Sequence, residues 1–308
     1  MDKCKKLLAA IDPSQGIGLE IGPLDSPIVT REMGNVRYVD HASTEDLRVK
    51  NRENPFVQLD RIVDVDYVWG AKTLPELVAT EAPFDYVIAS HVIEHVPDLV
   101  GWLSEVRAVL RPHGVLSLAV PDKRYCFDYY RQPTTSAEVL EAYLRRQRKP
   151  SFRQIFDHEA SFATVDGHLA WDAGTAGPPT RLHSLREAWD VARRASADES
   201  YHDVHCWVFT PASLFRLMAS LIELDLFDFL VSRFFPTASH EFFVSFRALD
   251  GSDDRDKARA VQLKSLPVVS DDDTSAAARY RGRPASIARR YLGRLRRILG
   301  RARSPLGR

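Results

Sequence analysis

The feature that most constrains the fold is a regular alternation, between Ile17 and Val120, of short β-branched runs with helical segments. The runs predicted as strands are 18–21, 36–40, 62–65, 86–89 and 115–120. Segment 100–110 has the apolar spacing of an amphipathic helix, which Pro112 and Gly114 end. Strands separated by helices form βαβ units with parallel strands. The sequence therefore predicts an α/β fold with a Rossmann-like, doubly wound and mostly parallel sheet.

A long insertion interrupts this pattern at 122–204, which is rich in aromatic, arginine and histidine residues. An insertion after a strand of an α/β sheet is a usual place for a cap over the acceptor, and the alternative is a surface subdomain that only packs. After it, Thr210 and Pro211 begin a helix at 212–222. Two predicted strands, 227–234 and 241–247, then follow with a short connection, which indicates an antiparallel hairpin.

The charge divides the chain further. The whole chain has 42 basic and 42 acidic residues, but 279–308 contains eleven arginines and no acid. Residues 1–278 therefore carry 31 basic against 42 acidic residues, a net charge of −11. We expect a domain at 1–249, an acidic linker at 250–285 and a basic amphipathic tail at 286–308.

The tail places Ile287, Tyr291, Leu295 and Ile298 at helical spacing among its arginines. A basic amphipathic helix is typical of segments that bind an anionic membrane surface. Docking on the acidic body and disorder are the alternatives, and nucleic acid is the least favoured partner.

Cysteine usage and apolar runs bear on the compartment. Cys4, Cys126 and Cys206 form no CxxC pair, which indicates neither a disulfide framework nor a thiolate metal site. No apolar run is long enough for a signal-peptide core or a membrane-spanning helix. We expect a cytoplasmic protein.

The first two predicted strands end in residues suited to a nucleoside ligand. Segment 16–22 does not fit the G-x-G-x-x-G pattern of dinucleotide-binding proteins, because Ile21 stands where the third glycine belongs. Glu20 can meet either the positive end of a zwitterionic ligand or an intervening amide, and Gly22 lets the backbone approach a ligand. Asp40 can accept hydrogen bonds from both hydroxyls of a ribose.

Two longer motifs carry a family resemblance. FDYVIASHVIEHVPD at 84–98 is followed by LRPHG at 110–114, and with GLEIGP at 18–23 the chain resembles class I S-adenosylmethionine-dependent methyltransferases. The resemblance implies a seven-stranded sheet with an antiparallel last strand, and S-adenosylmethionine as cofactor. It implies that the methionine end of the cofactor contacts Glu20, Gly22 and Pro23. The other implied cofactor residues are Asp40 at the ribose, Asp66 (or Asp64) near the adenine, and Ser90 and His91 at the reactive methyl group.

Candidate catalytic residues lie farther along the chain. His202 and His205 are candidate bases, because histidine titrates near neutral pH, and Asp122 ends the fifth predicted strand. Alternatively, His202, Asp203 and His205 could bind a divalent metal ion that polarises a hydroxyl. His95 belongs to the motif as a structural residue rather than a base, and 157–159 adds a further polar cluster.

The acceptor is inferred by resemblance and exclusion. There is no Asn/Asp-Pro-Pro-Tyr/Phe motif, which argues against methylation of nucleic-acid bases. The segment PDKRY at 121–125 is similar to that of methyltransferases of bacterial polysaccharide assembly, which implies a sugar or glycan hydroxyl as acceptor and a place at the inner membrane face. The alternatives are a natural-product or lipid methyltransferase, or a silent binding module.

Overall fold

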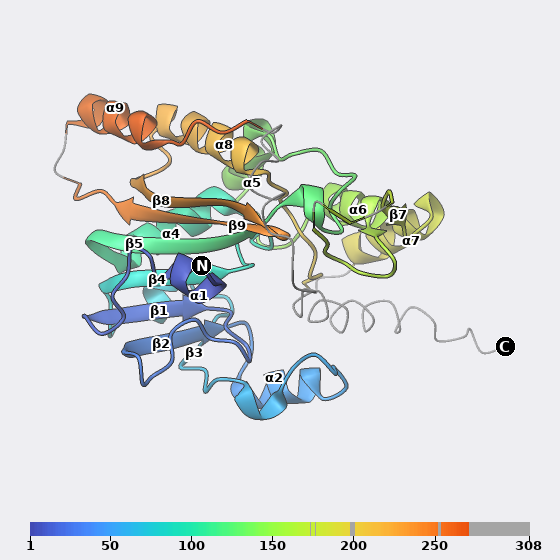
Figure 1. The fold of residues 1–308 in the computed structure, drawn as a ribbon, viewed down its shortest axis with the longest axis horizontal. Helices are drawn as coiled ribbons and strands as arrows, with labels where there is room; N and C mark the ends of the chain where they lie inside the picture. Colours follow the sequence, from blue (N-terminus) through green and yellow to red (C-terminus); the bar gives the residue numbers. More distant parts are fainter. Residues whose placement is uncertain (173, 176, 198–200, 252–253, 271–308) are drawn as a thin grey trace.

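One mixed sheet of seven strands organises the computed structural model, which describes residues 1–172, 174–175, 177–197, 201–251 and 254–270 (Figure 1). The strands are β1 (Ile17–Ile21), β2 (Asn35–Asp40), β3 (Tyr67–Val68), β4 (Phe84–Ser90), β5 (Leu110–Pro121), β8 (Phe229–Ala238) and β9 (Glu241–Ala248). Their order is β3-β2-β1-β4-β5-β9-β8, and β9 runs antiparallel to both of its neighbours. The predicted α/β fold with an antiparallel last strand is therefore confirmed.

The helices begin where the sequence offers capping residues. They are α1 (Lys3–Leu7), α2 (Thr44–Asn51), α3 (Leu74–Leu77), α4 (Leu99–Val109), α5 (Ser136–Leu144), α6 (Phe152–Ser161), α7 (Leu185–Ser196), α8 (Pro211–Glu223) and α9 (Arg255–Ser265). Thr210 caps α8 through the amide of Ser213, and Pro211 takes the first helical position, as predicted. Among the described residues, no helix combines the length and the apolar character needed to cross a membrane.

The two faces of the sheet are covered unequally. Along β4, Val87 and Ala89 join the larger core, which includes residues of α3, α4, α5 and α8. Tyr86 and Ile88 point to the opposite face, where Leu7 of α1 packs. This two-residue alternation is that of a strand buried on both faces. The described segment 22–34, which joins β1 to β2, contains no helix.

The third strand differs from the prediction. Residues 62–65 form no strand, and β3 comes later, at Tyr67–Val68. The apolar run points instead into a separate cluster, where Ile62 packs with Leu47. Its backbone bonds to loops, because Val63 N–H donates to Leu24 O at 2.9 Å.

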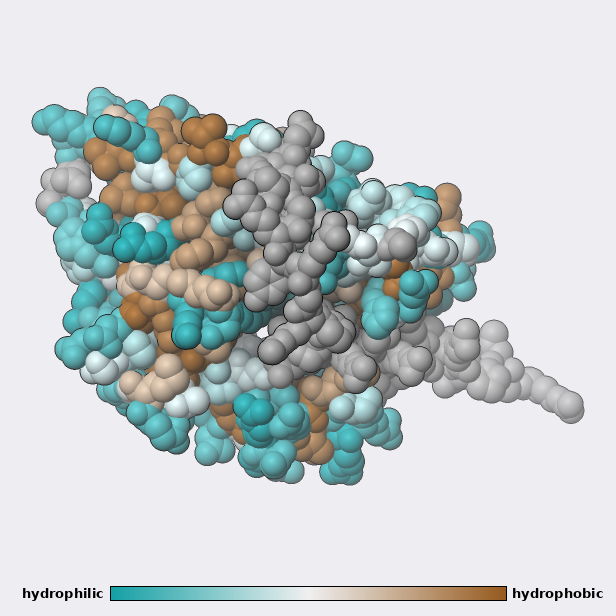
Figure 2. Space-filling model, in the orientation of Figure 1, coloured by the Kyte–Doolittle hydropathy of each residue, from teal (hydrophilic) through white to brown (hydrophobic). Residues whose placement is uncertain are grey.

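The predicted linker also differs from the structure. Residues 255–265 form α9, which is capped by Asp254 and packs on β8 and α8. Gln262 is buried there and donates to the carbonyl of Phe229 at 3.2 Å. Hydrophobic residues gather near β8 and α9 on the face shown in Figure 2. The predicted tail at 286–308 lies outside the described residues.

The inserted region 122–204 divides into two parts. Its helix α5 belongs to the main core, into which it places Val139 and Ala142. The pair α6 and α7, with the two short strands β6 (Ala163–Thr164) and β7 (Thr180–Arg181), forms a lobe at one end of the sheet (Figure 1). Because the chain enters this region directly from β5 through the short 3-10 helix at Lys123–Tyr125, the lobe follows the carboxyl end of that strand. That it covers an acceptor stays a prediction.

Candidate functional site

Three neighbouring parallel strands end at the same edge of the sheet. Ile21 of β1 is in register with Val39 of β2 and with Ala89 of β4. The next residues along each strand, Gly22, Asp40 and Ser90, therefore lie at one carboxyl edge. Ligands of open α/β sheets bind outside this edge.

The turn after β1 leaves its backbone accessible. Gly22 is exposed and has a φ of +68°, a conformation that favours glycine. An added Cβ would meet only the side chain of Val92, at 3.4 Å. Pro23 is buried one residue farther on, and its carbonyl accepts from Ser26 N–H at 2.9 Å. This edge can therefore receive a ligand against the backbone of Gly22.

Asp40 lies beside that turn with only 6% of its surface exposed. Its Oδ1 accepts from the amide of His41 at 2.7 Å and lies 2.6 Å from the ring Nδ1 of the same residue. These contacts hold the carboxylate in place at the end of β2.

Glu20 has a structural partner on each oxygen. Its carboxylate accepts from the amides of Ile28 at 2.7 Å and Val29 at 3.1 Å. Burial raises the pKa of Glu20 to about 7, although the two amide bonds act in the opposite direction. Of the two partners predicted for this acid, the structure contains the backbone amides, which fold segment 22–29 back against β1.

Two predicted site residues are corrected by their contacts. Asp66 lies at the amino end of β3, where its carboxylate accepts from Tyr38 N–H at 2.8 Å and from Arg31 at 3.0 Å. It therefore does not point to the carboxyl edge where an adenine would lie. The alternative, Asp64, is exposed and gives its carbonyl to Arg31.

Asp122 is the second correction, because its carboxylate is enclosed. The residue is fully buried, and Oδ2 accepts from Arg124 at 2.6 Å and from the Thr237 hydroxyl at 2.5 Å. Nε of Arg124 contacts both carboxylate oxygens, so neither oxygen is open to an acceptor. Asp122 anchors the start of the inserted region instead.

A buried polar cluster follows β4. His91 has a φ of +56°, and its Nε2 lies 2.7 Å from Glu241, which also pairs with Lys3 at 2.8 Å. Glu94 is completely buried three residues later. Burial would raise the pKa of Glu94, but the neighbouring histidines, with His91 first among them, hold it below its usual value.

His205 enters this cluster from the segment before α8. Its Nδ1 contacts Asp128 at 2.5 Å, and Arg131 bonds both Asp128, at 2.9 Å, and the His205 carbonyl, at 2.8 Å. Burial would raise the pKa of Asp128, yet His205 and Arg131 hold it well below its usual range. In the tautomer that carries its proton on Nδ1, His205 donates to Asp128 and has its lone pair on Nε2.

The metal ligands predicted from the sequence do not come together. Among the described residues, His202, Asp203 and His205 form no group with converging donor atoms. Asp203 lies instead 2.8 Å from Nδ1 of His95. His202 is partly buried on the same segment, and its role as a base stays a prediction.

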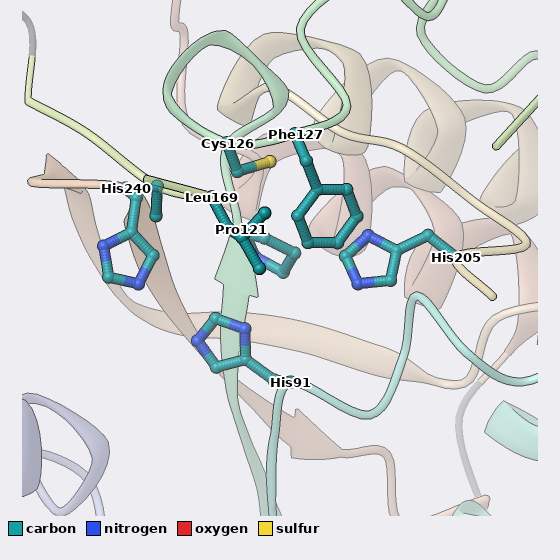
Figure 3. A pocket seen from close by; sticks show the side chains of 8 residues that line it. His91, Pro121, Cys126, Phe127, Leu169, His205 and His240 are labelled. Carbon is teal, nitrogen blue, oxygen red and sulfur yellow. The ribbon is translucent and has the colours of Figure 1, made fainter. Parts of the chain in front are cut away.

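A small pocket opens beside these groups (Figure 3). His91 after β4, His205 before α8 and His240 before β9 line it together with Phe127. The rings of Phe127 and His205 are 4.6 Å apart. Burial lowers the pKa of His240 to about 4, so this ring is neutral at pH 7. The pocket thus combines the neutral ring of His240 with other imidazole groups and an aromatic surface.

A family model described as a methyltransferase domain matches residues 1–221. The chain belongs to this methyltransferase family. With its seven-stranded sheet, it is a class I S-adenosylmethionine-dependent methyltransferase. None of the curated proteins matches the chain.

Several solved structures are similar to this methyltransferase. A S-adenosylmethionine-dependent methyltransferase from Methanosarcina mazei is 14% identical, with a TM-score of 0.40, over 79% of this chain and 97% of that one. The 1,6-didemethyltoxoflavin-N1-methyltransferase of Burkholderia thailandensis is 15% identical, with a TM-score of 0.39, over 80% of this chain and 76% of that one. An S-adenosylmethionine-dependent methyltransferase from Mesorhizobium loti is 14% identical, with a TM-score of 0.39, over 78% of this chain and 95% of that one.

Sequence reasoning on the methyltransferase missed Asp128 and Glu94 as site residues. Glu94 stands within the quoted motif, so its position was available, but only the fold reveals its complete burial. Asp128 follows Phe127 in the inserted region and is 77 residues from His205 in the chain. No local spacing could pair the two.

The buried Glu20 carboxyl group makes the stability of the methyltransferase depend on pH. Its pKa rises from 4.5 to about 7 on folding, so the folded state binds this proton more tightly than the unfolded state does. The linked stability is present below pH 4.5 and is lost as the pH rises through 7. Between pH 5 and 8, we expect the free energy of unfolding to fall by about 2.5 kcal/mol more in the wild type than in Glu20→Gln.

Urea unfolding of both proteins across this pH range measures the difference. Glu53→Gln, which changes an exposed glutamate, is the matched control and should follow the wild type. Equal pH slopes in the wild type and Glu20→Gln would contradict the prediction.

Proposed function

We propose that this methyltransferase methylates a hydroxyl of a sugar or glycan intermediate. The observation that carries the proposal is His205, whose ring is oriented by Asp128 and lines the pocket beyond β5. Histidine held by a carboxylate is a common means of activating a hydroxyl.

The carboxyl edge of β2, β1 and β4 suits the cofactor. Asp40 would accept the ribose hydroxyls, Gly22 would let the methionine end approach the backbone, and Ser90 and His91 would border the reactive centre. Pro23 would support the turn from below. S-adenosylmethionine supplies, when bound, a sulfonium methyl group that an oxygen lone pair can displace in line.

His205 would promote loss of the hydroxyl proton. Its Nε2 lone pair can accept that proton directly, or it can hold a cation that acidifies the hydroxyl. Arg131 fixes Asp128, and Asp128 fixes the imidazole, so little reorganisation is needed at the moment of reaction.

The pocket surface supports the proposed acceptor class. Phe127 offers an apolar ring next to imidazole groups, and a sugar combines C–H faces with hydroxyls in the same way. The lobe of α6 and α7 would cover the acceptor. The arginine-rich tail would place the enzyme at an anionic membrane surface on the cytoplasmic side, where lipid-linked glycan intermediates lie.

A transfer screen with methyl-labelled S-adenosylmethionine tests the acceptor. We expect label in neutral and nucleotide-linked sugars and in glycan fragments, and none in a matched set of deoxy analogues that lack the methylated hydroxyl. Label confined to natural-product or lipid acceptors would replace the proposed class. Binding of S-adenosylhomocysteine without transfer to any acceptor would favour a silent module.

A further inference from the structure

Three donor groups converge behind the pocket. Glu94 Oε1 lies 4.0 Å from Nε2 of His95 and 4.0 Å from Nε2 of His205. The three donor atoms all lie within 4.8 Å of one another, and the two imidazole rings stand at 88°. Glu94 is 0% and His205 is 2% exposed. The convergence is therefore inside the protein rather than at its surface.

The convergence lacks the hydrogen bonds that buried polar atoms normally make. Both carboxylate oxygens of Glu94 and Nε2 of His95 and His205 accept or donate no hydrogen bond within the described part of the chain. His91 Nδ1 lies 3.4 Å from Glu94 Oε1, too far for a strong hydrogen bond, so the buried carboxylate is only partly compensated. Buried polar atoms that converge with so few bonds favour an additional positive partner.

The second nitrogen of each histidine lies beside a carboxylate. His205 Nδ1 contacts Asp128 at 2.5 Å, and His95 Nδ1 lies 2.8 Å from Asp203. Metal-binding histidines commonly donate their outer N–H to a carboxylate, which fixes the tautomer and turns the lone pair toward the ion. His205 has that arrangement, whereas His95 Nδ1 lies close to Asp203 without hydrogen-bond geometry.

We propose that Glu94, His95 and His205 bind one divalent cation of the Zn²⁺ class. Two imidazoles and a carboxylate are a common donor set of catalytic zinc sites, which keep a fourth position open. Bonds of about 2.0–2.1 Å in tetrahedral geometry require donor separations of about 3.4 Å, so the donors would each move inward by a few tenths of an ångström.

The neighbouring group of His91, His240 and Glu241 does not share these properties. Glu241 is already paired with the ammonium group of Lys3 at 2.8 Å and with His91 at 2.7 Å. A cationic partner is therefore present there, and no second ion is inferred.

The role of the ion rests on the proposed function, whereas its binding rests on the geometry alone. His205 belongs both to the donor set and to the pocket wall. An acceptor hydroxyl in the open position would be acidified by the ion and would release its proton to water. The oxygen could then attack the methyl group as its bond to sulfur breaks, which leaves S-adenosylhomocysteine.

Metal analysis of the full chain tests the site. The wild type is purified, saturated with Zn²⁺, desalted and measured by plasma mass spectrometry. We expect about one zinc per chain in the wild type and in His168→Gln, which changes an exposed histidine, and at least a tenfold lower content in Glu94→Gln and His205→Gln. A chelator should lower the melting temperature of the wild type and not that of Glu94→Gln.

A wild type that is folded by circular dichroism yet retains no zinc would overturn the proposal, as would a Glu94→Gln variant with the full content. If the variants do not fold, Co²⁺ titration of the wild type decides: saturation at one ion per chain, reversed by Zn²⁺, supports the site, and absence of saturable uptake refutes it. If the chain methylates a sugar hydroxyl without bound metal, the metal site is refuted and the proposed function stands. If the chain binds zinc but methylates no hydroxyl, the metal site stands and the proposed function is refuted.

Discussion

Replacing His205 by alanine is expected to lower the rate of methyl transfer about 100- to 10,000-fold, the usual contribution of a group that promotes proton removal. The effect should appear in kcat rather than in cofactor binding, because His205 lines the proposed acceptor pocket and does not lie at the carboxyl ends of β2 and β1. Single-turnover transfer of labelled methyl groups measures the rate, and calorimetry with S-adenosylhomocysteine measures the affinity.

Asp128→Asn provides a second test of the same arrangement. It keeps the size of the side chain that contacts His205 Nδ1, but it removes the charge that favours the Nδ1–H tautomer. We expect a loss of rate that approaches that of His205→Ala, with a shifted pH profile. His168→Ala, at an exposed histidine of the same lobe, is the control and should leave the rate unchanged. Wild-type rates in His205→Ala would remove this residue from the chemistry.

Replacing Asp40 by alanine should weaken S-adenosylhomocysteine binding about 100-fold. Two hydrogen bonds from ribose hydroxyls to an ionised carboxylate contribute about 3 kcal/mol together, and this converts to about two orders of magnitude in Kd. Because Asp40 is held at the edge of the sheet by His41, its carboxylate is already positioned before the ligand arrives.

Calorimetric titration of the wild type, Asp40→Ala and Asp40→Asn measures this effect. Asp60→Ala removes an exposed acid of the same charge and should bind like the wild type. Melting curves separate lost affinity from lost folding, since Asp40 also accepts the His41 amide. An unchanged Kd in a folded Asp40→Ala protein would mean that the ribose lies elsewhere.

The placement of Gly22 and Asp40 at one edge of the sheet could be predicted because it depends on local order. A strand that ends in Asp40 and another that turns at Gly22 must bring both residues to one edge, once the strands are parallel. Asp66 was misplaced for a related reason: the apolar run at 62–65 has the composition of a strand, but it packs into a side cluster with Leu47. The strand begins four residues beyond Val63, and Asp66 consequently stands at its amino end.

Acids and histidines were harder to assign, because the same residue types serve both structure and chemistry. Asp122 sits at the end of the fifth strand, as predicted, but Arg124 and Thr237 enclose its carboxylate. Likewise, both carboxylate oxygens of Glu20 accept hydrogen bonds from the amides of Ile28 and Val29. Which role a polar side chain takes depends on its partners in space.

By itself, the sequence determined the α/β class, the antiparallel hairpin at the end of the sheet and the common edge of Gly22 and Asp40, where the cofactor is proposed to bind. These follow from residue periodicity and strand order, which act over short distances along the chain. Only the tertiary structure decided that Asp128 orients His205, and that Glu94, His95 and His205 face one another. Those contacts join residues as far apart in the chain as Glu94 and His205. Burial separates these groups from water, so their interactions depend on partners that only the fold brings near.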